Sequence, residues 1–191
     1  AFSPVTMGDW TGLLDKPLVL GDQFGIMGLS GFMLGGLTAN FGVLAFFLFQ
    51  MVFMDTAATI PTGSMAERLD FKGFVWMSLW VSMIIYPIAA MWVWGGGWLA
   101  NLGRSMGWGN GAVDFAGSGV VHLIGGAVAL AGAIVIGPRI GRFNKDGSAN
   151  AIPGHNIPMG VLGTIILFFG WFGFNPGSSL GFVGAFRDLA I

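Results

Sequence analysis

The chain has 191 residues, of which 54% are hydrophobic and only 9% are charged. A soluble domain usually carries about 25% charged residues, so this chain cannot cover a water-facing surface of its size. The net charge of −1 argues against a nucleic-acid-binding protein, and the high hydrophobicity excludes a disordered segment. The absence of cysteine excludes disulfide scaffolds and thiol-based sites. The composition therefore indicates an integral membrane protein that crosses the bilayer several times.

The first 40 residues do not contain a clear membrane span. Residues 1–21 mix apolar and charged side chains, and residues 24–37 are apolar but rich in glycine and too short to cross a bilayer. We expect residues 1–40 to form an extracytoplasmic loop and a short helix or loop at the membrane surface. Because the chain begins with Ala1 and ends in what resembles the start of another apolar segment, we expect it to be processed or incomplete.

Four later segments are long and apolar enough to cross a membrane as helices, which takes about 20 residues. They lie at roughly 41–63, 73–94, 115–137 and 157–174. The loops after the first and third spans contain five basic residues: Arg68, Lys72, Arg139, Arg142 and Lys145. The opposite side has three: Lys16, Arg104 and Arg187. Since basic loops stay in the cytoplasm, residues 1–40 and 95–113 are predicted to lie outside.

Ionisable side chains inside a membrane often mark a functional pathway. Asp55 and His122 fall within the predicted spans, and Asp114 lies at the outer end of the third. His122 either lines a conduit or is a core histidine bonded to a neighbouring helix. Asp114 either caps its helix or contacts a cation, and the two roles are compatible.

Asp55 follows Phe53 by two residues, which is about 200° around a helix. It is therefore predicted to face away from the stripe formed by Phe46, Phe49 and Phe53. We expect the Asp55 carboxyl group to hydrogen-bond Thr59 or another helix, because an unpaired buried charge is costly.

Aromatic residues gather at the outer ends of the second and fourth spans. Trp94 ends the second span, and Phe174 precedes an Asn-Pro-Gly sequence that is predicted to break the fourth helix just before Ser178. The predicted topology places Trp94, Asp114, Phe174 and Ser178 on one side, with His122 deeper. This pattern fits either an ordinary aromatic belt or an entrance for a solute.

Two segments closely resemble signatures of the ammonium transporter family, which includes methylammonium permeases and Rhesus proteins. The first is DFAGSGVVH, which ends at His122, and the second is GWFGFNPGS, which ends at Ser178. The sequence GPRIGRF that follows the third span is similar to the plant and cyanobacterial branch. The likeness covers most of residues 41–180.

The resemblance implies an all-α integral membrane protein with eleven helices in two inverted five-helix repeats. Residues 41–191 would form a partial domain containing about spans three to six and the approach to the seventh. The family forms a homotrimer with one pore in each subunit.

The resemblance also implies roles for individual residues. Trp94 and Ser178 match the outer substrate-binding site, with Asp114 beside it as a structural or electrostatic group. Phe53 and Phe174 match the pair of rings that gates the pore, and His122 matches one of two pore-lining histidines. Asp55 departs from the family pattern, and Trp92 leaves some choice of which indole meets the ion.

The function implied is transport of ammonium or methylammonium across the cell membrane, with cation recruitment, deprotonation and passage through a hydrophobic pore. The alternative is an ammonium sensor with the same fold, coupled to a cytoplasmic signalling domain or partner. A neutral-gas channel of the Rhesus type is disfavoured by Trp94. An enzyme is disfavoured because no metal cluster, nucleophile–base pair or phosphate-binding loop is found in the sequence. No cofactor or nucleic-acid partner is expected.

Overall fold

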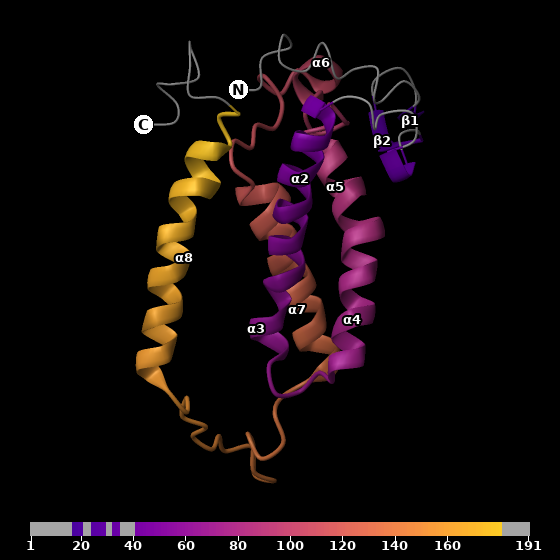
Figure 1. Ribbon diagram of the computed structural model, residues 1–191. Helices are drawn as coiled ribbons and strands as arrows, with labels where there is room; N and C mark the ends of the chain where they lie inside the picture. The colour runs from indigo at the N-terminus through magenta and orange to yellow at the C-terminus, as the bar shows by residue number, and fades with distance from the viewer. Residues whose placement is uncertain (1–16, 21–23, 30–31, 35–40, 181–191) are drawn as a thin grey trace. The chain divides into compact units, whose positions relative to one another are not determined.

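The computed structural model describes residues 17–20, 24–29, 32–34 and 41–180. The chain forms two compact units, residues 1–137 and residues 138–191. The elements of the first unit are β1 (Pro17–Leu20), β2 (Phe24–Gly28), the short 3-10 helix η2 (Phe32–Leu34), α2 (Phe41–Thr59), α3 (Pro61–Met65), α4 (Phe71–Trp80), the π-helical turn η3 (Val81–Ile85), α5 (Tyr86–Val93), α6 (Leu102–Met106), the π-helical turn η4 (Ser118–Leu123) and α7 (Ile124–Ile136) (Figure 1). The second unit contains α8 (Ile157–Gly177).

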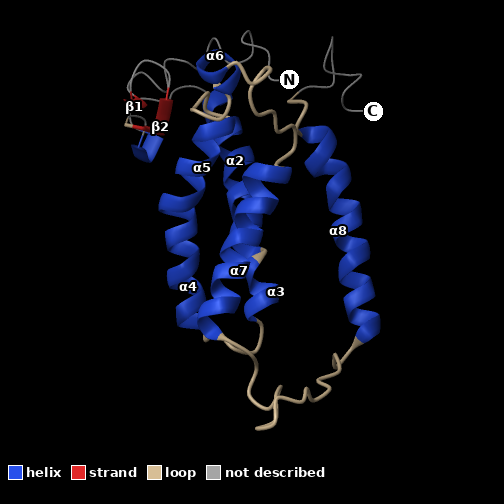
Figure 2. Cartoon of the chain, turned by 180° about the vertical axis from the view of Figure 1, so that it is seen from behind, coloured by secondary structure: helices blue, strands red, loops and turns tan. Residues whose placement is uncertain are grey.

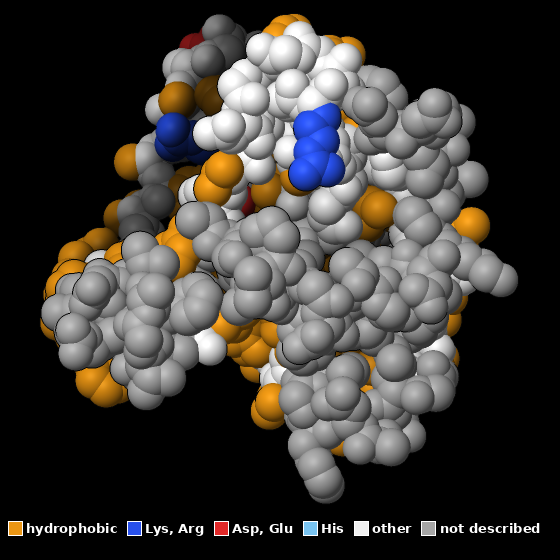
Figure 3. All heavy atoms as spheres, turned by 90° about the horizontal axis from the view of Figure 1, so that it is seen from above, with side chains coloured by type: hydrophobic (Ala, Val, Ile, Leu, Met, Phe, Trp, Pro, Cys, Tyr) orange, Lys and Arg blue, Asp and Glu red, His pale blue; other side chains and the backbone are white. Residues whose placement is uncertain are grey.

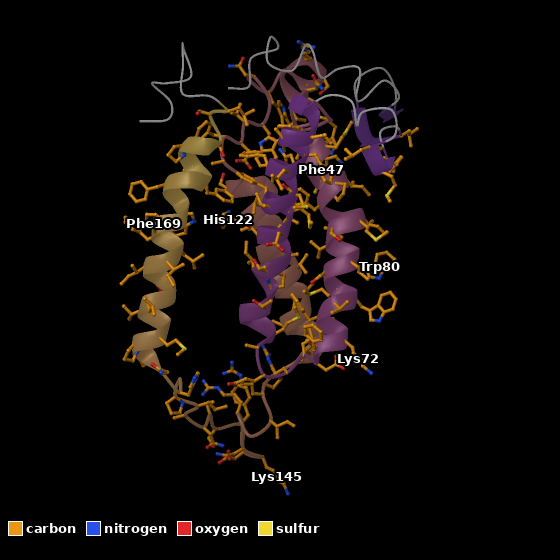
Figure 4. The ribbon with its side chains drawn as sticks, in the orientation of Figure 1. Phe47, Lys72, Trp80, His122, Lys145 and Phe169 are labelled. Atoms are coloured by element: carbon orange, nitrogen blue, oxygen red, sulfur yellow. The ribbon has the colours of Figure 1, made fainter. Side chains whose placement is uncertain are left out.

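The four predicted spans are confirmed as helices that are long and apolar enough to cross a membrane. They cover Leu44–Met65, Phe71–Val93, Ser118–Ile136 and Ile157–Gly177. Their outward surfaces are apolar, as a surface in contact with lipid or with further helices must be. Trp80 of α4 is 59% exposed and Phe169 of α8 is 78% exposed, and both side chains point away from their helices in Figure 4.

In the first unit, the helices pack side by side through small residues (Figures 1 and 2). A Cβ atom added at Gly125 of α7 would lie 2.8 Å from Ile60 and 3.0 Å from the carbonyl oxygen of Ala57. The Ser64 hydroxyl donates to the carbonyl oxygen of Ala129 at 3.0 Å. The close contact between α7 and the α2–α3 segment therefore depends on the absence of a side chain at residue 125.

The second span contains a π-helical turn immediately before Pro87. Proline has no N–H to donate to the carbonyl four residues earlier, so the regular ladder is interrupted there. The Tyr86 N–H bonds instead to Val81, five residues back. The extra residue in this turn puts Val81 and Tyr86, five residues apart, both on the buried side, and Met91 of α5 is the third buried position of the span.

One end of the first unit contains the start of α2, the end of α5 and helix α6. This end is predicted to be extracytoplasmic, and we call it the outer end. In Figure 3, a view onto this end, the described surface shows few charged side chains. At the opposite end, the Arg68 guanidinium donates to the carbonyl oxygen of Gly137 and so fastens the loop after α3 to the end of α7.

The N-terminal segment differs from the expectation. Within residues 24–37, where a short helix or loop is expected, Phe24–Gly28 form strand β2, which pairs antiparallel with β1, whereas Phe32–Leu34 form the short helix η2. The pairing is irregular between Leu18 and Val19. Residues 30–31 and 35–37 of the same stretch lie outside the described residues.

The loop of the second unit, residues 138–156, is ordered by its own polar side chains. Phe143 pairs with Ala149, and the Asn144 and Asn150 side chains hydrogen-bond each other. Hydrogen bonds from the hydroxyl and the backbone N–H of Ser148 hold the pKa of the Asp146 carboxyl group below its ordinary value.

The end of the fourth span also corrects the sequence reading. The helix does not break after Phe174 but continues through Asn175 and Pro176 to Gly177. Pro176 lies inside the last turn of α8, where only the end of the hydrogen-bond ladder is affected, and the break falls three residues later than predicted. Ser178 is the residue that follows the helix.

Candidate functional site

Trp94 is held at the outer end of α5 by two contacts. Its indole Nε1–H donates to the backbone carbonyl oxygen of Asp114 at 2.6 Å. Its ring meets the Phe53 ring edge to face, with centroids 5.9 Å apart and an interplanar angle of 60°. Because the indole N–H is already bonded and one ring contact is made, the orientation of the ring is fixed while the side chain stays half-buried.

Phe53 belongs to an aromatic stripe along α2. The ring centroids of Phe49 and Phe53 are 4.3 Å apart, and those of Phe46 and Phe49 are 6.3 Å apart. Phe53 is 2% exposed in this chain. The stripe therefore leads along α2 to the ring that contacts Trp94.

The Asp114 carboxylate caps the start of the third span. Oδ1 accepts from the backbone N–H groups of Gly117 (2.7 Å) and Ser118 (3.1 Å), and Oδ2 accepts from those of Gly119 (2.9 Å) and Val120 (2.7 Å). These are the donors that a helix start leaves unsatisfied. Asp114 is 7% exposed, so the cap is buried. This geometry favours the capping role over direct contact with a cation.

The helix begins at Ser118, three residues later than the start at residue 115 that the sequence predicts. Gly117 adopts φ = 91°, a left-handed conformation that glycine tolerates best. A Cβ atom there would lie 2.5 Å from Val121 and 3.3 Å from Cη2 of Trp94. The turn that Asp114 caps thus lies directly against the Trp94 ring.

His122 lies in the π-helical turn η4. Its Nδ1 atom is 3.2 Å from the carbonyl oxygen of Gly117, in the same helix. Since a carbonyl oxygen only accepts, this contact is a hydrogen bond in the tautomer with the proton on Nδ1. The His122 side chain is exposed in this chain.

A polar pair that we did not single out from the sequence links the first two spans. The Tyr86 hydroxyl donates to Oε1 of Gln50 at 3.3 Å, and Tyr86 is buried. A search restricted to charged residues misses this pair, although a glutamine in the middle of an apolar span is itself a signal.

Phe174 and Ser178 belong to the second unit. The Ser178 hydroxyl donates to the carbonyl oxygen of Phe174 at 2.8 Å, and Ser178 is buried. Its lone pairs are therefore oriented by a bond within the end of α8. Among the described residues, no three His, Asp or Glu side chains are grouped in a way that could hold a metal ion.

Asp55 lies on the exposed face of α2, whereas Phe53 is buried. The two residues therefore face different sides of the helix, as their spacing predicts. The Thr59 hydroxyl donates to the carbonyl oxygen of Thr56 at 2.8 Å and so does not donate to Asp55.

We predict that Asp55→Asn keeps the substrate selectivity of the complete protein and changes its melting temperature or assembly. The amide removes a charge from a face that packs on lipid or other helices, away from the aromatic stripe. Methylammonium uptake in competition with other cations measures selectivity, and size-exclusion chromatography measures assembly. A change of selectivity without a change of stability would contradict this placement.

Comparisons with known proteins show the family to which the chain belongs. A profile described as "Ammonium Transporter Family" matches residues 18–191. The chain belongs to the ammonium transporter family. It is 50% identical over 161 residues to the ammonium transporter Amt2 of Archaeoglobus fulgidus, covering 83% of this chain and 34% of that protein. It is 43% identical over 171 residues to ammonium transporter 1 member 3 of Solanum lycopersicum, covering 89% of this chain and 37% of that protein.

A solved structure titled Sensor Amt Protein has the same fold, with a TM-score of 0.72 and 43% sequence identity over 92% of this chain and 42% of that one. The plant relative confirms the resemblance to the plant branch. The chain spans about a third of the length of the curated relatives described above. It is thus part of the ammonium transporter fold within an integral membrane protein, and its relatives are named as transporters rather than as enzymes.

Proposed function

We propose that the complete protein transports ammonium or methylammonium, and that the cation first binds at the outer end against the Trp94 ring. The observation that supports this most directly is the fixing of this indole between the Phe53 ring and the Asp114 carbonyl oxygen. An aromatic face with a fixed orientation attracts a cation at little cost in side-chain entropy. The printed names of the archaeal and tomato relatives support ammonium as the substrate.

The chemistry follows from the cost of placing a charge in hydrocarbon, which is high for an isolated ion. Trp94 would attract the ammonium ion by a cation–π interaction of about 0.5–2 kcal/mol. Ser178 would accept a hydrogen bond from it, and the capped Asp114 carboxylate would add to the local field. Deprotonation near Phe53 and Phe174 would leave ammonia to pass along the apolar lumen. The released proton would follow separately through the pair of pore histidines that the family resemblance implies, of which His122 is one.

His122 suits the passage of ammonia because a neutral imidazole has one donor and one acceptor nitrogen. Ammonia also donates and accepts hydrogen bonds, so it can pass such a side chain without leaving an unpaired polar group. We further propose that the complete protein is a homotrimer in the bilayer, that residues 1–40 lie outside, and that residues 41–191 supply spans three to six and the approach to the seventh.

A sensor is the second candidate, because the solved structure with the same fold is titled Sensor Amt Protein. In that case ammonium would bind at the same outer site, and a cytoplasmic regulatory or signalling partner would detect the bound state. The two functions differ in whether substrate leaves on the other side.

The test is methylammonium uptake, together with ammonium-evoked current, in liposomes that contain the complete protein. Saturable uptake supports transport. Ammonium binding without uptake favours the sensor, and the absence of both would overturn the proposal.

We predict that Trp94→Leu weakens ammonium affinity by about the cation–π contribution, 0.5–2 kcal/mol, or roughly two- to thirtyfold. Ser178→Ala should weaken it as well, because an acceptor for an ammonium N–H is lost. Both changes are measured as an increase in the apparent KM for methylammonium. An unchanged KM in Trp94→Leu would mean that Trp92, or no aromatic residue, binds the ion.

A further inference from the structure

The β1–β2 hairpin is bonded to the end of α5 by backbone groups of β2. The Trp92 indole Nε1–H donates to the carbonyl oxygen of Ile26 at 2.9 Å. The backbone N–H of Trp98 donates to the carbonyl oxygen of Gly25 at 3.0 Å. The Trp92 and Trp98 rings meet edge to face, with centroids 5.6 Å apart. We call these four residues, Gly25, Ile26, Trp92 and Trp98, the outer clamp.

The clamp is tightly fitted at its glycine. A Cβ atom added at Gly25 would lie 3.1 Å from Cε of Met91 and 3.4 Å from Cα of Gly97. Met91 is itself buried, at 8% exposure. The hairpin therefore approaches the last turn of α5 and the turn that follows it at backbone distance.

The same network continues towards the Asp114 carbonyl oxygen. The carbonyl oxygen of Trp92 accepts a hydrogen bond from the backbone N–H of Ala100 at 3.0 Å. The carbonyl oxygen of Leu99 accepts one from the backbone N–H of Ala112 at 2.9 Å. Asp114 follows Ala112 by two residues. Hydrogen bonds joined by short stretches of chain thus connect the hairpin, through the side chain and the backbone of Trp92, with the segment that holds the Trp94 indole.

Trp92 and Trp94 do different things although they are two residues apart. They project in directions about 200° apart around the helix. Trp92 gives its indole N–H to the hairpin, whereas Trp94 gives its own to Asp114 and contacts Phe53. Trp92 therefore faces away from the ring that the proposed function uses.

We infer that Trp92 is a positioning residue: through the outer clamp, it sets where the Trp94 ring lies and so determines the affinity for ammonium without touching the ion. This inference rests on the proposed function. The hairpin then has a role in substrate binding at the outer end, although none of its described residues belongs to the aromatic stripe.

The first test is the Trp92→Phe variant of the complete protein, which keeps an aromatic ring and removes the indole donor. The apparent KM for methylammonium is expected to rise about two- to tenfold, the range for loss of one hydrogen bond, while the maximal rate stays within about twofold. The matched control is Trp108→Phe, because Trp108 is 66% exposed and lies outside the clamp. An unchanged KM in Trp92→Phe would overturn the inference.

A double-mutant cycle separates positioning from general destabilisation. If Trp92 acts only through Trp94, then Trp92→Phe has no further effect on the KM of a Trp94→Leu protein. Independent effects of the two substitutions, which multiply in the KM, would overturn the inference, since Trp92 would then act by another route.

A readout without transport keeps the inference distinct from the proposed function. The complete protein is labelled with 5-fluorotryptophan, and its ¹⁹F spectrum is compared with that of the Trp94→Leu variant. The resonance that is missing from the variant's spectrum is assigned to Trp94. That resonance is expected to shift in Trp92→Phe and to stay in place in Trp108→Phe. An unshifted Trp94 resonance in Trp92→Phe would overturn the inference whether or not the protein transports ammonium.

Discussion

Replacing Asp114 with alanine is expected to lower the melting temperature of the complete protein sharply and to abolish methylammonium uptake. The substitution leaves the backbone N–H groups of residues 117–120 without their acceptor, and those of Gly117 and Val120 are buried. Each unsatisfied buried donor costs about 1–3 kcal/mol, so the unfolding free energy should fall by about 3 kcal/mol or more even after partial relaxation. Thermal unfolding in detergent and uptake in liposomes measure the two effects.

Asp70→Ala is the matched control for this change. Asp70 caps α4 with one hydrogen bond, from the backbone N–H of Gly73 at 2.7 Å, and it is exposed. Loss of such a cap costs about 0.5–2 kcal/mol. Equal shifts in melting temperature for the two variants would show that the buried cap at Asp114 is no more important than an exposed one.

Gly117→Ala is expected to have the second largest effect, lowering both stability and ammonium affinity. The added methyl group would be forced against Val121, at 2.5 Å, and against the Trp94 ring, at 3.3 Å, in a backbone conformation with φ = 91°. Left-handed strain costs about 1–2 kcal/mol and overpacking about 1–3 kcal/mol, so a total of about 2–5 kcal/mol is expected. Thermal unfolding gives the stability, and the KM for methylammonium gives the affinity.

Gly147→Ala separates the two contributions to this effect. Gly147 also has a positive φ, 83°, but an added Cβ atom would meet nothing within 4 Å. This control should therefore show only the backbone strain and leave the KM unchanged. If Gly117→Ala behaved like Gly147→Ala, the close contact between the turn and the Trp94 ring would not matter for binding.

The spans were predictable because their physical cause is local. Each is a run of about 20 apolar residues, and a helix is the structure that satisfies its own backbone in lipid. The errors fall where a local rule competes with another contact. The fourth helix continues past Phe174 through Pro176, and the third begins at Ser118 because the chain turns at Gly117.

The N-terminal hairpin was missed for a different reason. An apolar, glycine-rich run of this length fits a strand, a short helix or a surface loop equally well. What selects the strand is pairing with β1, whose paired residues are 4 to 11 positions away, together with the approach of Gly25 to Met91. The second contact is remote in sequence, so a local pattern does not reveal it.

The sequence by itself determined the membrane class, the four spans, the family and the identity of the candidate site residues, because hydrophobic length and contiguous motifs depend only on neighbours along the chain. The tertiary structure decided which partners these side chains bond. It assigned the Trp94 indole to the Asp114 carbonyl oxygen and the Trp92 indole to Ile26, and it satisfied both Asp114 carboxylate oxygens with helix donors. Hydrogen-bond partners depend on distances of about 3 Å between segments that are remote in sequence, and packing sets these distances.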